Sequence, residues 1–163
     1  MALTANDIRV YLTGGVANTD PNLSLGGDTS TTEAGTGIHA LFDKVTSSES
    51  TAGDIEYRAI SIKNTHVSET AYAAVIYISI ETTSVNTTVA VGYDSVGTQA
   101  VANESTAPAG VSFSTPTTKA TGISVGDITA GSQRRIWERR TVTAGAASLA
   151  TDAGQITISF DTV

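Results

Sequence analysis

The chain has 163 residues, with nine Lys or Arg against sixteen Asp or Glu, which gives a formal net charge of −7. This balance argues against direct nucleic-acid binding, because phosphate contacts need Lys and Arg. The absence of cysteine excludes disulfides, thiolate catalysis and cysteine-based metal sites. No apolar run approaches the roughly 20 residues that span a bilayer, and the N-terminus lacks the basic start and apolar core of a signal peptide. We therefore expect neither a membrane nor a nucleic acid as a partner.

Hydrophobic residues make up 40% of the chain, which is typical of a globular protein. Charged residues make up only 15%, against roughly 25% in most soluble domains, and Thr, Ser, Ala and Gly take their place. A neutral surface rich in hydroxyl groups suits a protein that lies against others of its kind, or one that works outside a cell. A compositional habit of the source genome would explain the same bias.

Residues 7–13 alternate, with Ile8, Val10 and Leu12 on one face, and predict the first strand. The polar stretch Gly14–Gly37 then predicts a long loop, or an arm that packs on a partner. Leu23 and Leu25 predict a short strand inside it. In residues 38–45 the apolar side chains recur at helical spacing, which predicts a short helix or a 3₁₀ turn there, followed by a loop over 47–53.

Two strands are predicted next, over 55–64 and 73–83. Both faces of the second are apolar, which is typical of a central strand. Residues 87–93 follow after a short turn, at the spacing of a hairpin. Short strands are predicted around Ser112 and Ser124. A closing hairpin, built from a strand through Trp137 and a strand near the C-terminus, ends the chain.

Many short strands with almost no helix predict an all-β, single-domain β-sandwich, Ig-like or jelly-roll-like, with long loops and at most one short helix. Neither an internal repeat nor a linker divides residues 1–163.

The strand through Trp137 carries four of the nine basic residues, Arg134, Arg135, Arg139 and Arg140. Alternation puts Arg135, Trp137 and Arg139 on one face and the other two arginines on the opposite face. Because Trp and Arg are enriched in binding hot spots, this strand is a candidate interface. The alternative is that Trp137 or a neighbour fills the core, while the arginines shield an edge strand or pair with nearby carboxylates.

No catalytic or cofactor-binding constellation stands out. His39 and His66 each stand alone, without a second ligand at metal-binding spacing. The loop carboxylates lack the pattern of a calcium loop. The sequence therefore predicts no enzyme, no cofactor and no metal.

Several segments together resemble a family of small virion structural proteins of tailed bacteriophages. The resemblance covers most of the chain, and it is carried by residues 11–15, Asn18, Asp20, Pro21, Asn22, residues 24–27, 41–43, 53–58, 103–104, 106–114 and 135–140. The sequence departs from this family at Glu138, where an apolar residue is expected, so the resemblance leaves open which face of the strand is buried.

The resemblance implies a structural part of a phage particle, and for a small all-β domain a capsid decoration (cement) protein. Its partners would be the major capsid protein and further copies of itself, as a homo-oligomer. It would be assembled in the host cytoplasm and would reside on the capsid surface. The candidate contact residues are the four arginines with Trp137, and Asn18, Asp20 and Asn22 in the long loop.

Removing the charges of Arg139 and Arg140 is then expected to weaken binding to the particle without unfolding the domain. Two alternatives remain open. One is a tail-, neck- or fibre-associated virion protein. A more distant one is a carbohydrate-binding β-sandwich module, although aromatic residues make up only 6% of the chain.

Overall fold

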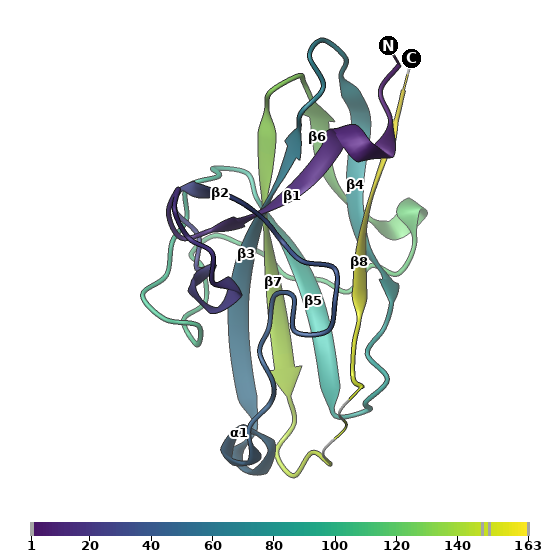
Figure 1. Cartoon of the computed structure of the whole chain (residues 1–163). Coiled ribbons are helices and arrows are strands. Elements are labelled where there is room, and N and C mark those ends of the chain that lie inside the picture. Colours follow the sequence, from purple (N-terminus) through teal and green to yellow (C-terminus); the bar gives the residue numbers. More distant parts are fainter. Residues whose placement is uncertain (1, 148, 150, 163) are drawn as a thin grey trace.

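Two antiparallel sheets pack against each other in the computed structural model of the chain, which describes residues 2–147, 149 and 151–162 (Figure 1). The five-stranded sheet has the order β2-β1-β3-β7-β5, and the three-stranded sheet has the order β6-β4-β8. The strands are β1 (Ile8–Thr13), β2 (Thr29–Glu33), β3 (Asp54–Asn64), β4 (Ala71–Ile80), β5 (Thr87–Asp94), β6 (Ile123–Ile128), β7 (Gln133–Val142) and β8 (Gln155–Asp161). The predicted all-β sandwich is confirmed.

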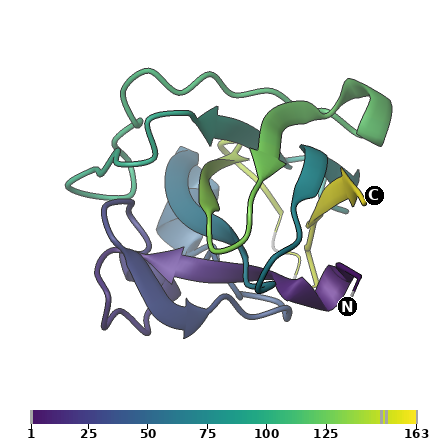
Figure 2. The same ribbon diagram turned by 90° about the horizontal axis from the view of Figure 1, so that it is seen from above.

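The helical elements of the described residues are the helix α1 (Ser47–Ala52) and three 3₁₀ turns, η1 (Ala5–Asp7), η2 (Pro21–Leu23) and η3 (Lys119–Thr121). With six residues, α1 is far too short to cross a membrane. The two chain ends lie on the same side of the sandwich (Figure 2).

The core lies between the sheets and is built from β-branched and small apolar residues. Isoleucines of β3 and β7 face isoleucines of β4, and the half-buried β8 side chains pack against them. The buried members are Leu3, Ile8, Ile60, Ile62, Ala71, Ala74, Ile76, Ile78, Val91, Val125, Ile128 and Ile136. The predicted central position of β4 is confirmed within its sheet. Its outer face is only half covered, because Val75 and Tyr77 remain partly exposed.

From β4 onward, each strand lies in the opposite sheet from the strand that precedes it in the chain. The predicted hairpin between 73–83 and 87–93 is therefore wrong, because β4 and β5 belong to different sheets. The predicted closing hairpin is wrong for the same reason: β7 pairs with β3 and β5, whereas β8 pairs with β4. A short turn between two apolar strands fits a crossing between sheets as well as it fits a hairpin.

The helix begins at Ser47, nine residues after Ile38, where the predicted helix begins. Residues 38–42 form turns and bends and residues 43–45 have no regular structure, and His39 has a φ of 63°, which interrupts a helical backbone. The helix α1 begins instead after Thr46, whose hydroxyl accepts a hydrogen bond from the backbone N–H of Glu49. The Glu49 carboxylate accepts a bond from the backbone N–H of Thr46 at 2.6 Å. This reciprocal capping box fixes the start of the helix.

The stretch Gly14–Gly37 is not a free arm. It contains η2 and the strand β2, which pairs with β1. Leu23 lies in η2 rather than in a strand. The loop before β2 folds back onto its own chain, where the backbone N–H of Gly14 donates to the carbonyl of Gly26 at 2.7 Å.

Candidate functional site: the arginine strand and the loop layer

The arginine strand is β7, and it lies inside the five-stranded sheet rather than at its edge. It pairs with β3 from Asp54↔Val142 to Lys63↔Gln133 and with β5 along its other side. The interpretation that its arginines shield an edge strand is therefore wrong. Instead, each arginine ties β7 to a different part of the chain.

Arg134 and Arg135 act at the upper half of the strand. The Nε of Arg134 donates to the carbonyl of Val125 at 2.9 Å, and its Nη2 donates to the carbonyl of Asp127, so the guanidinium satisfies carbonyls of β6. Arg135 is buried and donates to the carbonyl of Gly27 at 2.7 Å. These two side chains hold the neighbouring sheet and the loop after β1.

Trp137 is fully buried on the face of β7 that points away from the core. It lies under the loop around Gly26, where an added Cβ would come within 2.7 Å of the indole. Gly26 also has a φ of 89° and forms a bridge with Ala100. Only glycine fits this close approach of the loop to the indole without strain.

Two loops, residues 14–28 and 95–116, together cover this outer face, and we call them the loop layer. Phe113 of the layer contacts Tyr57, with ring centroids 5.5 Å apart, and the Arg139 guanidinium lies 5.4 Å from the centroid of the same ring. Such aromatic and cation–π contacts stabilise by roughly 0.5–1.5 kcal/mol each. The layer is thus packed on the sheet by side chains, as well as by the two bridges Gly26↔Ala100 and Val91↔Ser114.

Arg140 points to the inner face, where its Nε donates to Oε2 of Glu56 at 2.6 Å. Its Nη1 donates to the carbonyl of Asp43 at 2.5 Å. Glu56 is 1% exposed and also lies 3.6 Å from Arg58, measured from Oε1 to Nη2. Arg58 in turn pairs with Glu104 at 2.5 Å. Arg140, Glu56 and Arg58 form a buried ionic network beneath the loop that carries Asp43, and Glu104, whose side chain is 43% exposed, joins it from the surface.

Phe42 closes this network. Its ring centroid lies 5.0 Å from the Arg140 guanidinium carbon and 5.6 Å from that of Arg58. One aromatic ring thus covers two cations, which keeps water away from the ion pairs and strengthens them.

Two carboxyl groups of the inner face have perturbed acidities. Burial raises the pKa of Glu56, and the guanidinium groups of Arg140 and Arg58 oppose this rise. Burial alone raises the pKa of Glu138 to about 8. Within the described residues, Glu138 makes no hydrogen bond or ion pair that would offset the loss of water.

The candidate loop residues are brought together as well, but they mostly hold the loop itself. The amide of Asn18 donates to the carbonyl of Thr13 and accepts from the backbone N–H of Asp20. The carboxylate of Asp20 accepts from the backbone N–H of Asn22 at 2.9 Å and caps η2. All three remain partly or fully exposed.

The structure therefore narrows the candidate interface. Arg135, Trp137 and Arg140 are buried in their own chain and have no surface to offer a partner. Arg134 and Arg139 are half-buried. The expectation that loss of the Arg139 and Arg140 charges leaves the fold intact needs correction, because Arg140 neutralises the buried carboxylate of Glu56.

Sequence reasoning missed the exposed apolar side chains of the loop layer. Val16 and Leu23 are 60% and 57% exposed, and Val96 is 69% exposed. The two loops that carry them extend from the same side of the molecule (Figure 1). A single valine or leucine among Gly, Asn and Asp has no periodicity, so only exposure in the folded chain distinguishes it from a core residue.

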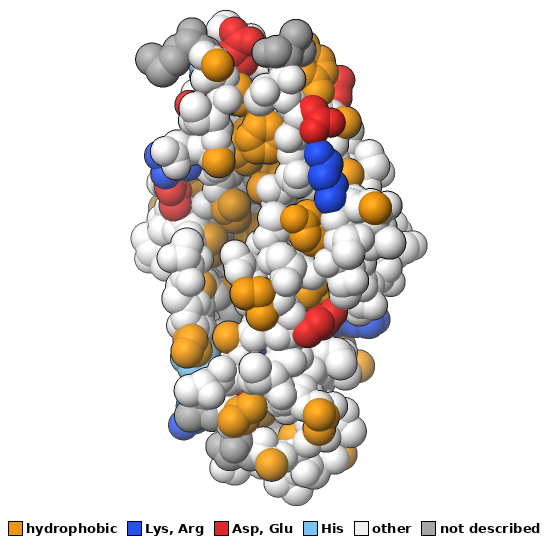
Figure 3. Space-filling model, turned by 90° about the vertical axis from the view of Figure 1, so that its right-hand side faces the viewer, with side chains coloured by type: hydrophobic (Ala, Val, Ile, Leu, Met, Phe, Trp, Pro, Cys, Tyr) orange, Lys and Arg blue, Asp and Glu red, His pale blue; other side chains and the backbone are white. Residues whose placement is uncertain are grey.

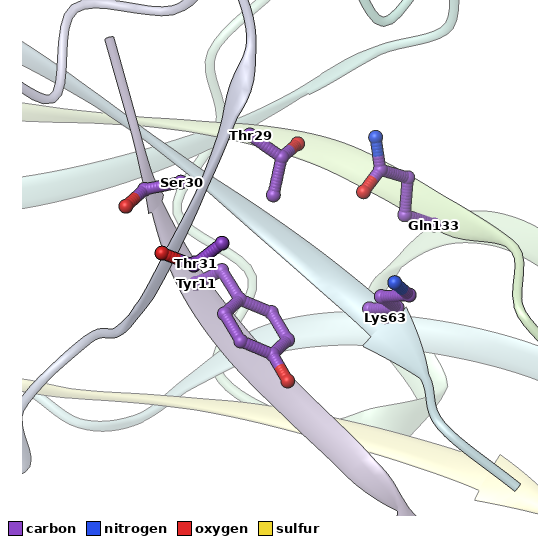
Figure 4. A pocket seen from close by; sticks show the side chains of 6 residues that line it. All are labelled: Tyr11, Thr29, Ser30, Thr31, Lys63 and Gln133. Atoms are coloured by element: carbon purple, nitrogen blue, oxygen red, sulfur yellow. The ribbon is translucent and has the colours of Figure 1, made fainter. Parts of the chain in front are cut away.

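A shallow hollow of about 300 Å³ lies on the outer face beside the loop layer (Figure 4). Its lining comes from β1, β2, β3 and β7, and consists of Tyr11, Thr29, Ser30, Thr31, Lys63 and Gln133. Within the described chain, the amino group of Lys63 has no ion-pair partner. The hollow thus offers a ring, an amide and a cation side by side.

His66 has a structural role. Its Nδ1 accepts hydrogen bonds from the backbone N–H groups of Ser68 and Glu69, at 3.1 and 2.9 Å. Over residues 2–147, 149 and 151–162, no group of three or more His, Asp or Glu side chains is placed to hold a metal ion.

Comparison with known proteins gives no relative: no family model, curated protein or solved structure matches the chain.

Proposed function

We propose that the protein is a structural component of a tailed-phage particle, and that it decorates and stabilises the capsid shell. This proposal rests on the resemblance to tailed-phage virion proteins over most of the chain, and on the place where the segments that carry this resemblance lie in the fold. Residues 11–15, 24–27, 103–104, 106–114 and 135–140 meet in one place, as the loop layer and the strand beneath it.

The roles of these residues support a structural protein over an enzyme. Gly26 permits the close approach to Trp137, Arg135 holds the loop, and Phe113 packs on Tyr57. These residues hold the loop layer in place on the sheet. A family of structural proteins is expected to share residues of this kind.

The mechanism is mechanical. A decoration protein bound at junctions between capsid subunits adds buried interface and raises the free energy needed to separate them. The bound protein shifts the equilibrium toward the assembled shell by mass action, because it binds the shell better than it binds free subunits. Many symmetric copies add avidity.

The exposed apolar tips of the loop layer are the contact surface that we favour. Val16 and Leu23 are more than half exposed, and exposed apolar side chains on an ordered loop are suited to bury area against a partner. The layer is held by hydrogen bonds and packing, so little ordering entropy opposes binding.

The test is binding of the purified protein to expanded, undecorated shells, followed by sedimentation and electron microscopy. We expect regular density on the shell. The double variant Val16→Ser and Leu23→Ser should lower occupancy at least about tenfold, equal to about 1.4 kcal/mol. The matched control is Val67→Ser, a 93% exposed valine in the turn between β3 and β4, which should bind normally.

A bare shell with the folded wild-type protein would overturn decoration. The protein would then be sought in the tail or neck of purified virions, which is the alternative within the same family.

The hollow beside the loop layer favours one other class, a carbohydrate-binding module. Tyr11 supplies a ring for stacking, and Lys63 and Gln133 supply hydrogen-bond donors. This candidate ranks below both phage structural roles because the lining has a single aromatic side chain. Titration with soluble oligosaccharides, followed by NMR, tests it: shifts confined to the hollow and lost in Tyr11→Ala would favour it.

A further inference from the structure

The sheet edges of the sandwich are not treated alike. The sandwich has four edge strands: β2 and β5 in the larger sheet, and β6 and β8 in the smaller. An uncovered edge presents unpaired N–H and C=O groups that can pair with another chain, and most proteins block such edges.

Three of the four edges are occupied by the chain itself. At β2, the backbone N–H of Thr31 donates to the carbonyl of Val16 at 3.0 Å. At β5, Val91 exchanges two backbone hydrogen bonds with Ser114, at 2.9 and 3.0 Å. At β6, the guanidinium of Arg134 donates hydrogen bonds to the backbone carbonyls of Val125 and Asp127.

The fourth edge, that of β8, is bare. Within the described part of the chain, the residues of β8 make backbone hydrogen bonds to β4 alone. Its inward side chains Ile156, Ile158 and Phe160 are only half-buried, although the facing Ile76 and Ile78 of β4 are 0% and 1% exposed. Figure 3 shows hydrophobic side chains gathered along the side of the molecule to which β8 belongs.

The usual devices that protect an edge are absent from this strand. Residues 155–160 read Gln-Ile-Thr-Ile-Ser-Phe, with no charge, no Pro and no Gly. The one charge of β8, Asp161, is neutralised by Lys119 at 2.8 Å.

From this edge we infer that the protein forms a two-fold dimer, in which β8 of one copy pairs antiparallel with β8 of a second copy. The charge of the chain and of this strand indicates which protein pairs with the β8 edge. Two chains that each carry −7 repel one another, so their contact is favoured where the surface is neutral, as it is along residues 155–160. A strand that alternates Ile, Ile and Phe with Thr and Ser is also complementary to itself.

The register follows from maximum overlap. The midpoint of Gln155–Asp161 is Ile158, so full overlap places Ile158 opposite its copy and Thr157 opposite Ser159 of the second copy. The two small sheets would join into one continuous sheet, and the half-buried inward side chains would cover each other.

The first test is the mass of the purified protein by sedimentation equilibrium over a range of concentrations. We expect a dimer that Ser159→Lys weakens at least about tenfold, because a lysine on the strand opposes close pairing. The matched control, Ser124→Lys on the exposed face of β6, should leave the dimer unchanged. A wild-type monomer throughout, or a dimer indifferent to Ser159→Lys, would overturn the inference.

The second test uses the absence of cysteine in the natural chain. A mixture of Thr157→Cys and Ser159→Cys proteins should form a disulfide on mild oxidation, because directly opposite residues lie about 4.5–5.5 Å apart. Each variant alone should remain uncrosslinked, since residues on the diagonal lie about 7–8 Å apart or more. Failure of the mixture to crosslink would overturn the proposed register and pairing.

The dimer does not depend on the proposed function, because both tests use the purified protein without shells. A monomer that still decorates shells would remove the self-pairing alone, and would point to a strand of another protein at this edge. A dimer that ignores shells would remove decoration alone.

Discussion

Along β3 and β7, the inner face of the five-stranded sheet changes character halfway. In the upper half, Ile60, Ile62 and Ile136 pack against the isoleucines of β4. In the lower half, the same two strands turn ionisable side chains to the same side, namely Glu56, Arg58, Glu138 and Arg140. Both halves are buried, but the first is covered by a sheet and the second by the loop that carries Phe42 and Asp43.

The difference between the two halves shows which contacts a covering sheet and a covering loop each need. A sheet supplies regular apolar contacts, which are non-directional and roughly proportional to area. A loop without a strand pattern supplies few such contacts, so directional ion pairs and one aromatic ring fix it instead. Buried pairs add little net stability compared with apolar packing, but removing one partner leaves a buried charge and is costly. The two halves should therefore respond differently to substitution.

The largest effect is expected for Arg140→Met. The variant leaves Glu56 buried without its closest cation, at a cost of about 3–5 kcal/mol. Urea denaturation measures this loss. The matched control is Arg139→Met, because this side chain is only half-buried and lies on the opposite face of β7, and we expect it to cost about 1 kcal/mol or less. Restoring most of the stability with the double variant Glu56→Met and Arg140→Met would identify the unpaired charge as the cause. Equal losses for Arg139→Met and Arg140→Met would contradict the network.

In the apolar half, Ile136→Ala should cost about 2–5 kcal/mol, because it removes buried methyl groups and leaves a cavity. Ile136 is fully buried in the core. Its loss should be the same at pH 5 and pH 8, since the methyl groups that the substitution removes are uncharged and pack within the apolar cluster. A change of more than about 1 kcal/mol between these pH values would show that the two halves are coupled.

Glu138 lies in the charged half but has no ion-pair partner among the described residues, and burial raises its pKa to about 8 from 4.5. Between pH 4.5 and 8 the unfolded chain loses this proton while the folded chain keeps it. Folding stability contributed by this group is therefore fully present below pH 4.5 and is lost as the pH rises toward 8, by up to about 5 kcal/mol. The pH window of this loss lies between the ordinary pKa of a Glu carboxyl, 4.5, and the raised pKa of Glu138, about 8.

Glu138→Gln removes this titration. Because the amide is still a buried polar group, we expect a gain on the order of 2–3 kcal/mol over wild type at pH 8, and a difference under about 1 kcal/mol at pH 4.5. Chemical denaturation of both proteins across this range checks the difference curve. A difference that does not vary with pH would show that Glu138 is ionised in the folded chain at neutral pH.

The sequence predicts the strands of this fold well, because alternation is a local signal. Residues 55–64 and 73–83 fall on β3 and β4 with small errors at their ends. Which strands pair is not local. The crossing between sheets after each strand from β3 onward leaves no mark in a short turn, so both predicted hairpins failed.

The site shows the same limit more strongly. The arginines of β7 stand out in the sequence, but their partners are distant: Glu56 is 84 positions from Arg140, and Gly27 is 108 from Arg135. Only the fold shows that Arg135 and Arg140 are buried and bind segments of the chain that are distant in sequence. The helix is different, because Thr46 and Glu49 form a capping box that is legible in the sequence and outweighs the apolar spacing of residues 38–45.

That capping box gives the smallest predicted effect. The loop that covers the charged half runs directly into α1, so Thr46 anchors the end of this cover. Thr46→Ala removes the side-chain bond to the backbone N–H of Glu49 and should cost about 0.5–2 kcal/mol. The control is Thr51→Ala inside the helix, which should change stability by less than about 0.5 kcal/mol, because alanine has the higher helix propensity. If the cap also holds the loop over the ionic network, the losses of Thr46→Ala and Arg140→Met will be less than additive when combined, whereas strictly additive losses would confine the cap to the helix.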